Sequence, residues 1–125
     1  MRDKGGRMAK RIERLRAERE QTISRKAIAY IRANLSQKLT LEDIAGALFL
    51  NPAYLSSTFK RETGLAMTRF INRERVELAK DLLSRQQLST QEVSDRLGFG
   101  TYRYFCSVFK RETGRTPGDY RSRPH

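Results

Sequence analysis

The chain has 125 residues, of which 38% are hydrophobic and 32% charged, and its formal net charge is +12. This length suits one compact domain, or two very small ones that share a core. The sequence contains no run of about 18 apolar residues for a membrane span and no apolar signal-peptide core. We therefore expect a soluble, cytoplasmic protein that does not bind membranes.

The basic charge belongs to the folded part of the chain as well as to its N-terminus. Arginine outnumbers lysine by 19 to 7, and residues 1–22 carry eight basic and four acidic groups, which leaves +8 for the remainder. Arginine suits planar two-point contacts with phosphate and guanine. A basic surface indicates nucleic acid more often than an anionic membrane. The plain alternative is that the charge only maintains solubility.

The residues that metal and nucleophile chemistry needs are scarce. Cys106 is the only cysteine, and His125, the last residue, is the only histidine. The chain therefore has no internal disulfide and no cysteine cluster for zinc. It also lacks a Gly-rich phosphate loop, so common catalytic constellations cannot be assembled. We predict no enzyme, no cofactor and no metal.

In chain order, residues 1–21 are dense in charges of both signs, which is typical of an N-terminal extension or linker. From Thr22 to about Leu35, apolar residues recur at helical spacing and predict a supporting helix. Thr40 then places a hydroxyl N-cap before two acids, which indicates a short helix of about two turns.

A second helix is predicted to begin at Asn51-Pro52, with Asn as its N-cap and Pro at its first helical position. Leu55 and Phe59 form its buried stripe, and Gly64 is suited to end it. A short helix, a tight turn and a second helix ended by glycine make a helix-turn-helix pattern.

A longer helix is predicted from about Met67 to Ser84, a rod of about 27 Å at 1.5 Å per residue. Its polar face carries charged side chains such as Arg69 and Arg73. Its expected apolar positions are Met67, Phe70, Ile71, Leu78, Ala79, Leu82 and Leu83, with Val76 beside them.

The same pattern then returns. The hexapeptide over residues 59–64, Phe-Lys-Arg-Glu-Thr-Gly, recurs letter for letter over residues 109–114. Ser89 begins the second copy as the N-cap of a capping box, and Thr101 caps its second helix after a turn one residue longer. A last short helix begins at Thr116-Pro117. One helix-turn-helix unit is therefore used twice.

The second helix of each unit has an exposed face suited to DNA. Opposite the buried stripe lie Ala53, Ser57, Lys60 and Arg61 in the first copy, with Ser56 on one flank. The second copy places Arg103, Ser107, Lys110 and Arg111 there, with Tyr104 nearby. These faces hold small or basic side chains and no acid until near the helix ends, so each can lie in a major groove. An ordinary solvated face is the bland alternative.

The two faces are expected to differ in what they can read. The side chains of Ala53, Ser56 and Ser57 are short, so the first unit is expected to discriminate weakly between bases. Arg103 is the best candidate for a two-point contact with guanine, which contributes about 1–3 kcal/mol of discrimination. Contacts with phosphate, which orient without specifying, are expected from Thr40, Lys60, Arg61, Ser89, Thr101, Lys110 and Arg111.

The second unit carries a recognisable signature: Gly98-Phe99 to Tyr104-Phe105, then Phe109-Lys110-Arg111, Gly114, Thr116-Pro117 and Tyr120-Arg121. These residues, the repeat and the long central helix resemble AraC/XylS-family transcription regulators over about residues 23–121. The resemblance implies seven helices, with a first unit at 22–65, a linker helix at 66–85 and a second unit at 86–123.

The resemblance further implies a sequence-specific regulator, such as an activator, that places two recognition helices in adjacent major-groove segments of double-stranded promoter DNA. By position, the family's base-reading residues fall on Ala53, Ser56, Ser57, Arg103, Tyr104 and Ser107. RNA polymerase and an upstream sensor or receiver domain are candidate partners.

Three other classes of protein remain as alternatives. The first is a DNA-repair methyltransferase, since some of these resemble the family in carrying such a domain beside a reactive cysteine. Cys106, however, lies mid-helix and lacks the multi-cysteine zinc site of that chemistry. The second is a non-specific basic nucleic-acid-binding protein, with steep salt dependence and little sequence preference. The third is a helical bundle that binds only proteins.

Overall fold

The computed structural model describes residues 14–15, 22–85 and 87–122, and these residues form helices and no strands. Residues 14–15 and 22–33 are helical. The helices that follow are α2 (Leu41–Ala47), α3 (Pro52–Thr63), α4 (Met67–Ser84), α5 (Thr90–Arg96), α6 (Tyr102–Thr113) and α7 (Pro117–Ser122). The all-α prediction is confirmed, and the extension predicted at 1–21 lies outside the described residues except for 14–15.

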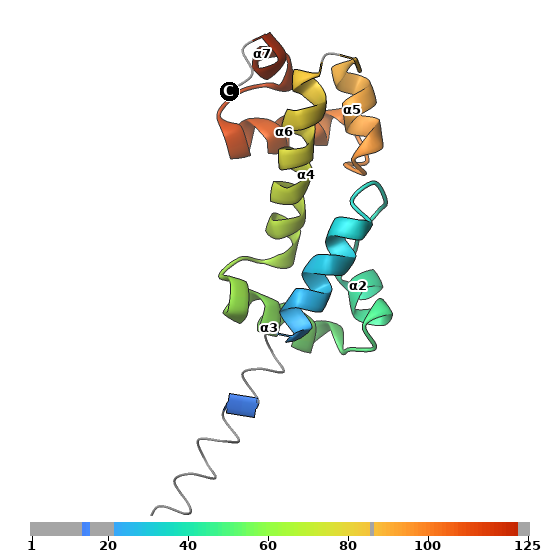
Figure 1. Ribbon diagram of the computed structural model, residues 1–125, viewed down its shortest axis with the longest axis vertical. Helices are drawn as coiled ribbons and strands as arrows, with labels where there is room; N and C mark the ends of the chain where they lie inside the picture. The colour runs from blue at the N-terminus through green and yellow to red at the C-terminus, as the bar shows by residue number, and fades with distance from the viewer. Residues whose placement is uncertain (1–13, 16–21, 86, 123–125) are drawn as a thin grey trace, which may run out of the picture.

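Two groups of helices are joined by α4, which runs through the middle of the molecule (Figure 1). The first unit consists of the helix over residues 22–33 with α2 and α3, around the start of α4. The second unit consists of α5, α6 and α7, around its end. The predicted arrangement of two helix-turn-helix units on a long linker helix is confirmed.

Each unit has its own hydrophobic core, and α4 contributes to both. Met67 and Ile71 of α4 pack in the core of the first unit. Val76, Ala79 and Leu83 pack in the core of the second. The other buried members of the first core are Ala27, Ile31, Leu35, Ile44, Ala45, Leu55 and Phe59. Those of the second core are Val93, Leu97, Phe99, Phe105, Val108, Phe109 and Tyr120.

Leu78, one of the expected apolar positions of α4, is 42% exposed and does not belong to either core. Leu78 follows Ile71 by seven residues, so both lie on one face of the helix at 100° per residue. On that face Ile71 packs in the core of the first unit near the start of α4, whereas Leu82, further along, is only partly buried against the second unit. Val76 lies about 140° around the helix from Ile71 and is buried by the second unit. The two halves of α4 therefore bury different faces.

The predicted helix starts are confirmed in their chemistry. Thr40 and Ser89 each form a complete capping box, with Asp43 and Glu92 respectively. The Asn51 side chain accepts a hydrogen bond from the backbone N–H of Tyr54 at the start of α3. Thr101 and Thr116 use their hydroxyls in the same way for α6 and α7. Each side chain satisfies a backbone donor that a helix leaves without a partner.

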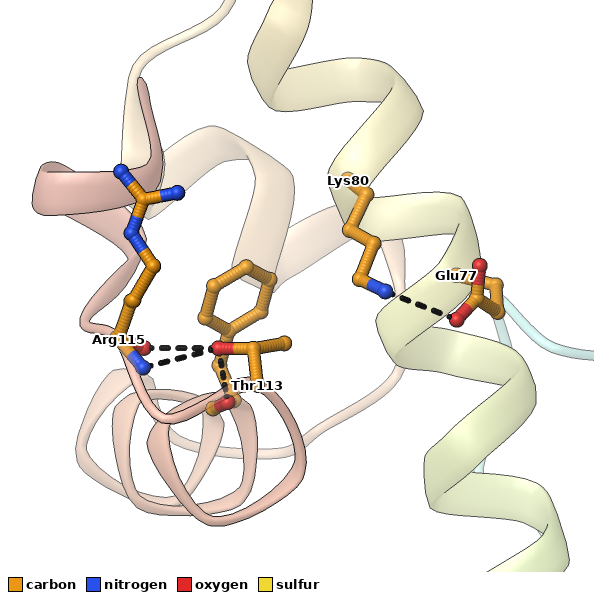
Figure 2. Close-up of polar contacts among 5 residues, drawn as sticks. Glu77, Lys80, Thr113 and Arg115 are labelled. Carbon is orange, nitrogen blue, oxygen red and sulfur yellow. Dashed lines mark hydrogen bonds and ion pairs between the residues drawn. The ribbon is translucent and has the colours of Figure 1, made fainter. Parts of the chain in front are cut away.

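The repeated hexapeptide ends α3 and α6 with the same geometry. Gly64 and Gly114 adopt φ of 80° and 81°, the left-handed conformation that favours glycine. Before them, the Thr63 hydroxyl donates to the Phe59 carbonyl at 2.7 Å, and the Thr113 hydroxyl makes the equivalent bond at 2.8 Å. The Thr113 oxygen also accepts from the backbone N–H of Arg115 at 3.1 Å (Figure 2). The repeat is therefore a duplicated helix stop.

This geometry predicts opposite effects of alanine at two kinds of glycine. An added Cβ at Gly114 meets no atom within 4 Å, so only the left-handed backbone opposes it. We expect Gly114→Ala to lower the free energy of unfolding by about 1–2 kcal/mol. Gly46→Ala, at an equally open position inside α2, should raise it by about 0.5–1 kcal/mol. Urea denaturation checks both, and a shift of the same sign for the two variants would show that backbone conformation does not decide the effect.

The turns inside the two units use different residues at the left-handed position. In the first unit, Phe49 follows Leu48, the C-cap residue of α2, and has φ of 57°. Gly98 occupies the corresponding place after Leu97, with φ of 70°. The Phe49 side chain is 94% exposed, so this turn combines an unfavourable backbone conformation with a solvated ring.

Candidate nucleic-acid interface

The face of α6 that points away from the core is basic, as predicted. Phe105, Val108 and Phe109 are buried. The exposed side chains on the opposite side of the helix are Arg103, Ser107, Lys110 and Arg111. Because the aromatic side chains fix the rotation of α6 about its axis, they also fix the direction of this polar face.

The corresponding face of α3 is smaller and less strongly polar. Leu55, Thr58 and Phe59 are buried and orient the helix. Ala53, Ser57, Lys60 and Arg61 are exposed, whereas Ser56 is half-buried. The Ser57 hydroxyl donates to the Tyr54 carbonyl of its own helix at 3.2 Å. The side chains predicted to read bases in the first unit are thus short. Ala53 and Ser57 are accessible, Ser56 is half-buried, and the Ser57 hydroxyl is already hydrogen-bonded within its own helix.

The predicted base reader Tyr104 is held by α4. Asn72, which is only 3% exposed, donates a hydrogen bond from Nδ2 to the Tyr104 hydroxyl at 3.0 Å. The Tyr104 side chain stays 42% exposed at the start of α6. No role was predicted for Asn72, because a contact across 32 residues leaves no trace in local periodicity. Tyr104 therefore connects the recognition helix to the linker helix.

An open cleft of about 570 Å³ lies between the start of α4 and α6. Its lining residues are Ala66, Thr68, Arg69, Asn72, Tyr104 and Arg111. Ala66 gives α4 no side-chain cap, so backbone donors of its first turn have no such partner. Arg69 was predicted only as part of the polar face of this helix. The cleft is continuous with the exposed face of α6 through Tyr104 and Arg111.

The acid at the end of α6 is directed away from solvent. The Glu112 side chain is only 10% exposed, and its Oε2 lies 3.5 Å from Arg111 Nε and 3.9 Å from Arg69 Nε. This carboxylate lines a neighbouring pocket beside α4, so it offsets part of the local positive charge from there rather than from the outer face of α6. The outer face of α6 thus has no acidic side chain between Arg103 and Arg111.

The hydroxyls predicted to contact phosphate serve first as helix caps. Thr40, Ser89 and Thr101 each accept a backbone N–H of their helix at 3.0 Å. An accepting hydroxyl keeps its own hydrogen free to donate. Lys60 and Lys110 are exposed near the ends of α3 and α6. Their contacts with DNA stay predictions.

Other chemistry finds little support in the part of the chain that the structure describes. Over those residues, no group of three or more His, Cys, Asp and Glu side chains could hold a metal ion. Cys106 is half-buried and packs against the core of the second unit. No described helix combines the length and the apolar character that crossing a bilayer requires.

Residues 44–123 match a family described as a helix-turn-helix domain. The regulatory protein PocR of Salmonella typhimurium is 39% identical over 97 residues, which are 78% of this chain and 32% of PocR. The C-terminal domain of AraT, a response regulator from Geobacillus stearothermophilus, is 38% identical with a TM-score of 0.77, over 80% of this chain and 84% of that domain. The chain belongs to the AraC/XylS family.

A further AraC-type neighbour, the DNA-binding domain of AdpA in complex with a target DNA, is 25% identical with a TM-score of 0.75. The match covers 79% of this chain and 89% of that one. The chain spans about a third of the length of its curated relative PocR. The family predicted from the second unit's signature is confirmed, and membership in a family of regulators agrees with the prediction that this domain is not an enzyme.

Proposed function

We propose that the chain is the sequence-specific DNA-binding domain of a transcription regulator, which inserts α3 and α6 into successive major-groove segments of double-stranded DNA. The observation that carries the proposal is the pair of recognition helices with exposed faces free of acidic side chains before Glu62 and Glu112. The AdpA domain, whose structure was solved with its target DNA, has the same fold and supports this function.

The size of the linker helix suits the proposed geometry. The 18 residues of α4 span about 27 Å at 1.5 Å per residue. Recognition helices in successive major grooves on one side of DNA lie about 34 Å apart. Two helices on one chain thus take the place of the two subunits of a helix-turn-helix dimer. Because their exposed residues differ, the site should be asymmetric.

Base reading is assigned to the exposed or flanking side chains of both helices, namely Ala53, Ser56, Ser57, Arg103, Tyr104 and Ser107. Arg103 is the strongest of them, because its guanidinium can donate twice to the edge of one guanine. The bases opposite α3 should matter less, since that face offers a methyl group and two short hydroxyls. Specificity is therefore expected to be concentrated in the half-site under α6.

Contacts with the DNA backbone are assigned to Thr40, Lys60, Arg61, Ser89, Thr101, Lys110 and Arg111. These residues surround the two faces or lie at the N-termini of helices, where backbone donors favour phosphate. They would orient each helix in its groove without selecting a base.

Substitution of the lysines distinguishes contacts with the DNA backbone from contacts with bases. Lys60→Ala and Lys110→Ala should each weaken binding to all sequences alike and reduce the slope of log K against log salt by about 1. Lys26→Ala, an exposed position on the helix over residues 22–33, is the charge-matched control and should leave the slope unchanged. Fluorescence anisotropy at several salt concentrations measures both. An unchanged slope for Lys60→Ala and Lys110→Ala would remove these residues from the interface.

The function itself is tested by selection from random duplex DNA with the full chain. We expect enrichment of one asymmetric motif with two parts. A non-specific basic protein, the alternative function, would bind the pool tightly at low salt and enrich no motif. That result would overturn the proposal even if the affinity were high.

The rest of the regulator is part of the proposal. AraT is a response regulator whose matched portion is its C-terminal domain, which supports an upstream receiver or sensor domain for a regulator of this kind. Activation of transcription through contact with RNA polymerase, in the cytoplasm where promoter DNA lies, completes the proposed role.

A further inference from the structure

Arg75 lies near the middle of α4 and ties that helix to a loop of the first unit. Its side chain is charged, yet the residue is only 6% exposed. Nε donates a hydrogen bond to the Leu35 carbonyl at 3.1 Å, and Nη2 donates to the Gln37 carbonyl at 2.6 Å. Both carbonyls belong to the loop between the helix over residues 22–33 and α2. Burial lowers the pKa of the Arg75 guanidinium from its ordinary value, while the interaction with Tyr104 acts in the opposite direction.

The same guanidinium also meets the turn of the second unit. Its central carbon lies 5.8 Å from the centroid of the Phe99 ring, in a cation–π contact. Gly98, next to Phe99, approaches the first unit directly. A Cβ built on Gly98 would lie 2.8 Å from the Gln37 carbonyl oxygen and 2.9 Å from that of Leu35. Leu35, Gln37, Arg75, Gly98 and Phe99 therefore form one contact, called here the junction.

The junction joins two units whose hydrophobic cores are separate clusters. Both clusters include residues of α4, so the linker helix is one connection between the units. A single helix can bend and twist, and each unit would follow its own half of it. Direct contact between the 35–37 loop and the 98–99 turn adds a second connection, with Arg75 bonded to one side and stacked on the other. Two connections should constrain the angle between α3 and α6 more tightly than one helix alone.

We propose that Arg75 is a positioning residue that sets the spacing between the two DNA half-sites which the domain accepts. The inference rests on the proposed function, since it concerns the spacing between the two half-sites of the DNA that the domain would bind. The planar fork of arginine can donate to two carbonyls while its face covers a ring, which the lysine ammonium cannot do. Loss of the Arg75 contacts at the junction should therefore broaden the range of accepted spacings, while the base contacts in each half-site stay the same.

The test uses the full chain and the selected two-part site, with its spacer kept or changed by one or two base pairs. One base pair moves the half-sites by about 3.4 Å and rotates them by about 35°. We expect the wild type to bind each altered spacing about tenfold more weakly or worse, because one helix loses its base contacts. Arg75→Met and Arg75→Lys should reduce that ratio several-fold. Arg73→Met, an exposed arginine on the same helix, is the control and should keep the wild-type ratio.

A second measurement covers variants that fold poorly. Phe99→Leu keeps an apolar side chain in the core but removes the ring under Arg75. It should therefore also reduce the ratio of the affinities for the selected and the altered spacings. Without DNA, spin labels at Ser57→Cys and Ser107→Cys in a Cys106→Ala background report the distance between α3 and α6. We expect a narrow distance distribution that broadens when Arg75→Met is added.

The outcomes separate the two proposals. An Arg75→Met profile equal to that of the wild type, or an equal loss at every spacing and on isolated half-sites, overturns the role of Arg75. A wild type that selects a motif yet tolerates all spacings also overturns it and leaves the proposed function intact. Failure to select any motif counts against the proposed function instead. In that case the spin-label measurement still tests Arg75, because an unchanged distance distribution in Arg75→Met would show that Arg75 does not position α3 relative to α6.

Discussion

Phe109→Ala should unfold the second unit, with a loss of about 3–5 kcal/mol in the free energy of unfolding. The Phe109 ring is fully buried. It packs at 5.8 Å from the Phe105 ring and at 5.5 Å, edge to face, from Tyr120 of α7. Truncation would remove a ring contact between α6 and α7 and leave a cavity between them. Thermal melts and amide hydrogen exchange measure the loss.

The first unit offers the matched experiment. Phe59 holds the same position in the hexapeptide, is fully buried and packs edge to face on Phe70 at 5.3 Å. Because the cores are separate clusters, Phe59→Ala should lower hydrogen-exchange protection mainly in α2 and α3, and Phe109→Ala mainly in α5 to α7. Native-like melts for both variants would contradict the assignment of these side chains to the cores.

Arg103→Ala should relax base preference at one position of the half-site read by α6. The expected loss of discrimination is about 1–3 kcal/mol, that of one two-point contact with guanine. Parallel selections on random duplex DNA compare wild type and variant. Arg25→Ala, exposed on the helix over residues 22–33, removes the same charge elsewhere and should leave the motif unchanged. Identical motifs for wild type and Arg103→Ala would show that Arg103 does not read a base.

Local chemistry made much of this fold predictable. The caps Thr40, Asn51, Ser89 and Thr101 are chosen by the backbone donors beside them, so their side chains mark helix starts without reference to the rest of the chain. The glycines of the repeat likewise mark helix ends, because their left-handed conformation is local. The exposed faces of α3 and α6 followed from helical geometry once Leu55 and Phe59, and their counterparts, were placed inside.

Contacts between distant segments were not predictable in the same way. The exposure of Leu78 was not predictable, because the helical pattern does not show where the first unit stops covering α4. Asn72 and Arg75 looked like ordinary polar residues of a long helix. Their partners, Tyr104 and the carbonyls of the 35–37 loop, are 32 to 40 residues away. Periodicity records which face is apolar and carries no record of which polar residue meets a distant loop.

Methylation interference on the selected site tests the use of two recognition helices directly, because methyl groups at guanine N7 block the major groove where recognition helices lie. We expect two clusters of interfering guanines, about one helical turn apart on one side of the duplex. The cluster under α6 should show the stronger interference and should weaken at one guanine in Arg103→Ala. A single cluster, or interference spread evenly along the duplex, would contradict the use of two recognition helices in successive major grooves.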